Sequence, residues 1–276
     1  MKQPHKVIPA CFLLVLYGAL TLFPIYWSIT TSFKSREQIF VRKPEWFPGS
    51  FTLANYAEMF SRGSVSIYFF NSIVVAALTV ALTLVIASMA GFGLTRYRFR
   101  GRRFITYSIL TVRIVPSLVY LIPFYLIFSH FKLTDKIHTL VFCYSAISLP
   151  LAVWLFIGFF EEIPSTIYEA ALIDGASEYG LFFKVAFPMV LSGVVVVTLL
   201  TFLAAWNEFA IALILTNKDS VRTLPMGINT MIMNQKEKPY GFLTAAGTVA
   251  MLPALVLAVT TQKYLIRGLM AGSVKG

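Results

Sequence analysis

Two acidic residues, Glu169 and Asp174, lie in the most polar stretch in the second half of an otherwise strongly apolar chain. The stretch reads Tyr168-Glu169-Ala170-Ala171-Leu172-Ile173-Asp174-Gly175-Ala176 and leads on to Pro188. Alanine keeps the surface of a helix low, and glycine accepts the left-handed conformation that ends one. Fixed charges beside small side chains are suited to a surface that a partner backbone approaches closely. We therefore predict that residues 161–188 receive another protein.

Local signals predict a helix-turn-helix within this segment. Pro164 and Ser165 favour a helix start, because proline is tolerated in the first turn and serine can cap free N–H groups. Gly175 ends that helix, and Ser177 begins a second one that runs to Phe187. We expect Pro188 to stop the second helix, since proline lacks the N–H that the helix needs.

The rest of the chain predicts a membrane protein. Of its 276 residues, 58% are hydrophobic and only 13% are charged, against roughly 25% charged in soluble domains. Apolar runs long enough to cross a bilayer as helices recur along the chain. We predict one all-α, polytopic transmembrane domain over residues 1–276, with six spans at about 7–33, 65–95, 104–129, 139–160, 189–216 and 241–262.

The basic residues predict the orientation of these spans. Lys and Arg number eleven on each side of the six-span topology, but five arginines fall within residues 96–103. Such a dense cluster in a short connection marks the cytoplasmic side. We therefore place residues 96–103, the segment 161–188 and both termini in the cytoplasm. The net charge of +11 is explained by span ends that meet lipid, so nucleic acid is not an expected partner.

Three polar residues inside the apolar runs are candidates for a substrate path or gate. Arg113 lies about 13 Å inside the third span at 1.5 Å per residue, where it either snorkels to the surface or serves packing or a pore. Asn207 and Glu208 lie at the outer end of the fifth span. They are either solvated or hydrogen-bond a hydroxyl-rich ligand.

Catalytic motifs are missing from the sequence. No Gly-Lys pair occurs, so there is no phosphate-binding P-loop, and there is no Gly-x-Ser-x-Gly nucleophile motif. The two cysteines, Cys11 and Cys143, lie in apolar runs and suggest neither a disulfide nor a metal site. We expect a chain that is not an enzyme, holds no cofactor or metal, and depends on a partner for any ATP chemistry.

The segment resembles the signature loop of bacterial binding-protein-dependent ABC importer permeases. That pattern is matched by Glu169-Ala170-Ala171, Asp174-Gly175-Ala176, Phe183 and Pro188. The carbohydrate branch of the family, of the maltose-permease kind, is resembled by Trp206-Asn207-Glu208-Phe209, by Arg222-Thr223-Leu224-Pro225-Met226-Gly227 and by the ending at 267–276.

This resemblance implies a function and a set of partners. It implies a multi-pass subunit of the bacterial inner membrane that forms half of a sugar pathway with a second, homologous permease. ATPase subunits that bind ATP and Mg would dock on the coupling residues Glu169, Ala170, Ala171, Asp174, Gly175 and Ala176, and a sugar-binding protein would dock outside. The alternative is a secondary transporter or channel, which would be expected to carry several intramembrane ionisable groups.

Overall fold

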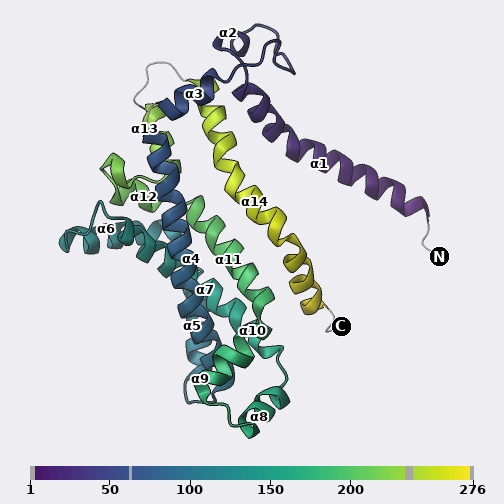
Figure 1. The fold of residues 1–276 in the computed structure, drawn as a ribbon, viewed down its shortest axis with the longest axis vertical. Coiled ribbons are helices and arrows are strands. Elements are labelled where there is room, and N and C mark those ends of the chain that lie inside the picture. Colours follow the sequence, from purple (N-terminus) through teal and green to yellow (C-terminus); the bar gives the residue numbers. More distant parts are fainter. Residues whose placement is uncertain (1–3, 62–63, 234–238, 274–276) are drawn as a thin grey trace. The chain divides into compact units, whose positions relative to one another are not determined.

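The computed structural model of the chain describes residues 4–61, 64–233 and 239–273, where all regular structure is helical (Figure 1). The all-α prediction is therefore confirmed for these residues. The chain divides into two compact units. Unit 1 consists of Met1–Ser66 and Gly227–Pro253, and unit 2 consists of Ile67–Met226 and Ala254–Gly276.

Unit 1 is built around α1 (Pro4–Ser32), followed by α2 (Arg36–Ile39) and α3 (Ala54–Ser61), and it also takes in most of α13 (Leu224–Met233) and the start of α14 (Tyr240–Ser273). Lys34 orders the loop that follows α1. Its ammonium donates to the carbonyl of Glu45 at 2.5 Å and lies 4.5 Å from the ring of Trp27. Asn55 donates to the carbonyls of Ser32 and Lys34, both at 2.9 Å. These bonds tie α3 to the end of α1.

Unit 2 contains most of α4 (Ser64–Arg96), then α5 (Arg102–Val112), α6 (Leu121–His130), α7 (Ile137–Glu161) and α11 (Leu191–Trp206). Helix α7 packs against both α5 and α11. It also lies close to α4, because a Cβ added at Gly91 would come within 2.6 Å of the Cβ of Phe156. The buried core around this contact includes Phe92, Phe156, Phe160 and Phe182.

Two of the predicted spans are interrupted. The third consists of α5, a short 3-10 helix at Ser117–Tyr120 and α6, because Pro116 lacks the N–H that would continue α5. The fifth ends at Trp206, and α12 (Ala210–Leu215) follows after a break. Within the described ranges, four helices are long and apolar enough to cross a membrane, and a pair bent by 75° gives a fifth. The count of six spans stays a prediction.

The second helix of the segment does not end at Pro188, contrary to the sequence prediction. After α9 (Glu178–Gly180) the chain winds as a π-helix over Leu181–Ala186, and α10 (Phe187–Met189) follows directly. Pro188 lies in the first turn of α10, where a missing N–H costs little. The wider π turn lets the chain continue through the proline, and the bend comes at Val190 instead.

Candidate functional site

Helix α8 (Ser165–Ile173) and the turn after it form the centre of the candidate site. Gly175 adopts a φ of +82°. Its N–H donates to the carbonyl of Leu172, and the N–H of Ala176 donates to the carbonyl of Ala171, both at 3.0 Å. This pair of bonds is a Schellman motif, which needs a left-handed residue at the position of the glycine. The glycine of the Asp-Gly-Ala sequence is therefore the residue that the turn requires.

The predicted start signals for the two helices fared differently. The residue that caps α8 is Pro164, which offers no side-chain hydrogen bond, so the serine cap expected at this helix is not formed. Ser177 caps the second helix as predicted, because its hydroxyl accepts the N–H of Gly180 at 3.2 Å. The predicted helix-turn-helix is present.

The structure brings the six coupling residues together on α8 and its turn. Glu169, Ala170, Asp174 and Gly175 are exposed, whereas Ala171 and Ala176 are half-buried. Ala171 packs against the core of unit 2. Its small side chain therefore serves internal packing, and only the exposed members of the set present a free surface in this chain.

Helix α8 is anchored to the end of α4 through Tyr168. This side chain is only 6% exposed. Its ring lies 6.2 Å from that of Phe92, and the guanidinium of Arg96 lies 5.5 Å from the ring centroid. Burial raises the pKa of the Tyr168 hydroxyl. The anchor thus combines apolar burial with a cation over an aromatic face.

Two polar contacts add to this anchor. The hydroxyl of Tyr97 donates to Glu178 at 2.5 Å, and Arg102 pairs with Glu161 at 3.5 Å. The hydrogen bond to the Glu178 carboxylate, together with burial, raises the pKa of Tyr97. Residues 96–103, interpreted from sequence as an orientation signal, therefore also hold the segment 161–188 at Glu161, Tyr168 and Glu178.

Sequence reasoning missed an apolar surface at this site. Ile173 is 86% exposed, Tyr179 is 79% exposed and Phe183 is 60% exposed. Large apolar side chains gathered in one exposed segment mark an interaction surface. The available signal was the presence of such residues within the most polar segment of the second half of the chain.

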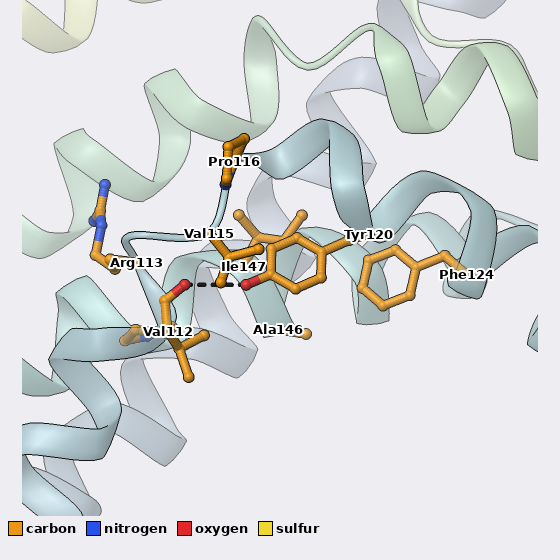
Figure 2. A pocket seen from close by; sticks show the side chains of 9 residues that line it. Val112, Arg113, Val115, Pro116, Tyr120, Phe124, Ala146 and Ile147 are labelled. Carbon is orange, nitrogen blue, oxygen red and sulfur yellow. Dashed lines mark hydrogen bonds between the residues drawn. The ribbon is translucent and has the colours of Figure 1, made fainter.

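The three candidates inside the apolar runs lie elsewhere in unit 2 and do not form one site. Arg113 caps the end of α5 and lines a cavity of about 460 Å³ together with residues of α6 and α7 (Figure 2). Asn207 is exposed, and its amide donates to the carbonyl of Leu203 at 2.8 Å. Neither Asn207 nor Glu208 lines that cavity.

The carboxylate of Glu208 caps α12. One oxygen accepts the N–H of Ile211 at 2.8 Å and the other accepts the N–H of Ala212 at 3.2 Å. A carboxylate is favourable at a helix start because free N–H groups and the positive end of the dipole meet there. The structure thus gives Glu208 a structural task, while its role in a substrate path stays a prediction.

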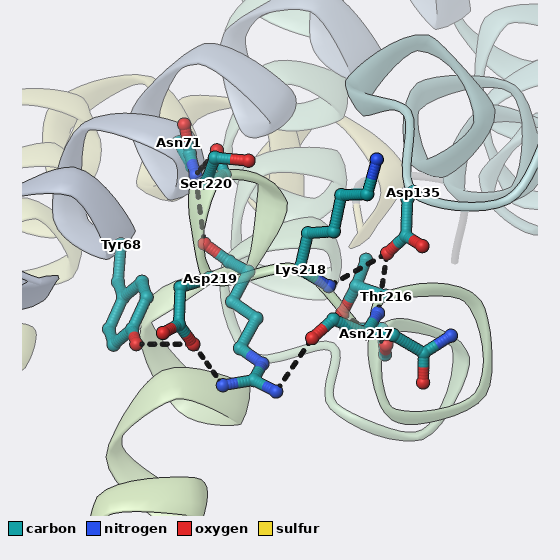
Figure 3. A network of polar contacts seen from close by, with 10 residues as sticks. Tyr68, Asn71, Asp135, Thr216, Asn217, Lys218, Asp219 and Ser220 are labelled. Atoms are coloured by element: carbon teal, nitrogen blue, oxygen red, sulfur yellow. Dashed lines mark hydrogen bonds and ion pairs between the residues drawn. The ribbon is translucent and has the colours of Figure 1, made fainter.

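A polar network fixes the loop after α12, at the opposite end of unit 2 from α8 (Figure 1 and Figure 3). Asp135 accepts the N–H groups of Asn217 and Lys218 at 2.5 and 2.9 Å. Asp219 pairs with Arg222 and accepts from Tyr68 at 3.1 Å. These carboxylates were not predicted, since their partners are distant in the sequence.

Comparison with known proteins decides the family. Residues 83–270 match the family described as binding-protein-dependent transport system inner membrane component. The chain belongs to this family. The matched range includes the helix-turn-helix of this permease. It also includes the residues of α4 that hold α8 in place.

Relatives of the permease align over nearly its whole length. The sulfoquinovosyl glycerol transport system permease protein SmoH of Agrobacterium fabrum is 35% identical over 274 residues, which cover 99% of this chain and 94% of the relative. The trehalose/maltose transport system permease protein MalG of Thermococcus litoralis is 33% identical, covering 95% and 94%.

Solved structures share the fold of the permease. A chain from a bacterial ABC transporter that imports the acidic polysaccharide alginate superposes with a TM-score of 0.85 at 19% identity, covering 96% of this chain and 98% of that one. A second, from an alginate transporter in complex with a pentasaccharide-bound periplasmic protein, has a TM-score of 0.69 at 13% identity. At these identities the likeness concerns the fold.

Proposed function

We propose that this permease is the membrane subunit of an ATP-driven carbohydrate importer and that α8 is its coupling helix. The observation that carries the proposal is the exposed surface of α8 and α9, which combines acidic and apolar side chains on a rigidly anchored tip. The relatives named above support the substrate class, because their names are those of sugar transport systems.

The proposed partners follow from the same surface and from the family. A pair of ATPase subunits binds ATP and Mg²⁺ and docks on α8, a second permease completes the pathway, and an extracytoplasmic sugar-binding protein delivers the substrate. The arginines at 96–103 support a cytoplasmic position for α8 and both termini. Closure of the ATPases moves α8, and its anchor on α4 carries this motion into the spans as alternating access. This chain itself catalyses no reaction.

The docking surface is tested at Ile173, the last residue of α8. Because its side chain is 86% exposed, Ile173→Asp removes no internal packing. Burying that charge against the ATPase costs the affinity of an interface hot spot, about 2 kcal/mol or more. We expect copurification of the ATPase subunits and ATP-dependent sugar uptake to fall about 30-fold. Glu162→Gln, an exposed change at the start of the same segment, serves as the control.

Two results would contradict the proposal. Unchanged ATPase binding and uptake in Ile173→Asp would remove α8 from the docking surface. Sugar uptake by the permease in vesicles that lack any ATPase subunit would instead support the alternative of a secondary transporter.

A further inference from the structure

The cavity beside Arg113 is a feature of unit 2 that docking at α8 does not use (Figure 2). It lies where α5 ends and the chain breaks at Pro116, and α7 forms its other wall through Ala146, Ile147 and Pro150. A smaller cavity of about 90 Å³ between α7 and α11 shares Arg113 and Ile147 with it. Arg113 therefore belongs to both spaces.

Arg113 is a cation that has no counter-ion among the described residues. It lies 11 positions beyond Arg102, where α5 begins, which corresponds to about 16 Å of helix, roughly half of the hydrocarbon thickness. In the described ranges its guanidinium makes no hydrogen bond or ion pair. A charge at membrane depth is costly unless it meets a partner or water, so an ionic partner of Arg113 would have to come from outside the described residues.

Five carboxylates among the described residues of unit 2 have hydrogen-bond or ion-pair partners, and none of these partners is Arg113. Glu208 caps α12, and the others pair with backbone, tyrosine or arginine groups; they are Asp135, Glu161, Glu178 and Asp219. The group that meets Arg113 is thus not one of these.

The wall of the cavity that lies away from the guanidinium of Arg113 carries two aromatic side chains (Figure 2). The rings of Tyr120 and Phe124 are stacked with centroids 6.1 Å apart and planes at 25°, and such faces pack against the C–H face of a sugar. Tyr120 is held in place because its hydroxyl donates to the carbonyl of Val112 at 3.0 Å. Pro150 has no N–H, so the carbonyl of Ala146 lacks its usual helical donor and can accept a sugar hydroxyl.

We infer that the substrate of this permease is a carbohydrate that bears an anionic group, and that Arg113 binds this group. The inference rests on the proposed import function. Guanidinium groups bind carboxylates and other oxyanions through paired, charge-assisted hydrogen bonds. A uronic acid and a sulfonated sugar offer the same chemistry, so the probes below distinguish them.

The inference is tested with the complete complex, including its own binding protein, in proteoliposomes loaded with ATP. Uptake is measured for three disaccharide or monosaccharide probes and their neutral counterparts: a galacturonate disaccharide, glucuronosyl-glucose and 6-deoxy-6-sulfoglucose. We expect anionic probes to be imported by the unmodified complex. Arg113→Gln lowers that uptake about 10- to 100-fold, the range for lost charge-assisted bonds. Arg113→Lys keeps the charge but loses the paired donors, so it restores only part of the uptake. Val119→Ala, an exposed position outside the lining of the cavity, leaves the uptake unchanged.

Three outcomes overturn the inference, and they can be told apart. If the unmodified complex imports only neutral sugars, the anionic class is wrong while sugar import stands. If Arg113→Gln reduces uptake of neutral and anionic probes equally, Arg113 pairs with the second permease. If no sugar is imported at all, the proposed function fails together with the inference.

Discussion

Gly91 provides the most direct test of the packing that supports α8. It lies on α4, where a Cβ would come within 2.6 Å of the Cβ of Phe156 and 3.2 Å of its carbonyl carbon on α7. Carbon atoms pack favourably only at about 3.5–4.0 Å, so Gly91→Ala must push the two helices apart by roughly 1 Å. Backbone cannot rotate away as a side chain would, and overpacking of this kind costs about 1–3 kcal/mol.

Gly93 supplies the matched control, since a Cβ there meets nothing within 4 Å. We expect Gly91→Ala to lower the Tm of the purified complex by about 2–12 °C, at about 2–4 °C for each kcal/mol, and Gly93→Ala to leave it in place. Thermal unfolding followed by size-exclusion chromatography measures both. Equal Tm values for the two variants would refute the close approach of α4 and α7.

Three further predictions concern the anchors and the cap. Tyr168→Ala empties the site that fixes α8, at a cost of about 3–5 kcal/mol, so amide hydrogen exchange of α8 rises at least about 100-fold. Tyr168→Phe keeps the ring and therefore the protection from exchange. Equal exchange in both variants would contradict the anchor. Glu208→Ala leaves two N–H groups of α12 uncapped and lowers the free energy of unfolding by about 0.5–2 kcal/mol. Glu208→Gln retains an acceptor oxygen and normal sugar uptake. Loss of uptake in a stable Glu208→Gln complex would show that the charge itself is needed. The raised pKa of Tyr97 means that its bond to Glu178 stabilises the fold fully below pH 10, the ordinary tyrosine pKa, and that this contribution disappears as the pH rises through the raised value. Tyr97→Phe should lack this alkaline component in ultraviolet difference titrations of unfolding, and an unchanged profile would exclude it.

The helix-turn-helix could be predicted because its signals are local. Gly175 and Ser177 act within a few residues of their own positions, through a left-handed turn and a capping hydroxyl. The contact of Phe92 with Tyr168 joins helices 76 positions apart, and no local pattern encodes it. The break in the fifth span was missed although its signal is local: the Glu208 carboxylate accepts the N–H groups of Ile211 and Ala212, three and four positions further on.

The sequence predicted the acidic residues of the docking surface but not its apolar residues. Glu169 and Asp174 stand out as charges in an apolar chain, whereas Ile173 and Tyr179 look like two more members of a hydrophobic majority. Their exposure is set by the direction in which α8 and α9 face once Tyr168 is buried. Residue type alone does not contain that direction.

The turn after α8 is closed by main-chain bonds alone, from Gly175 to Leu172 and from Ala176 to Ala171. The side chains of Glu169 and Asp174 make no hydrogen bond with the described residues, so folding places no demand on their chemistry. These two positions can therefore change to match a different ATPase subunit without disturbing the turn. The backbone of the turn is thus independent of the two acidic side chains that it presents.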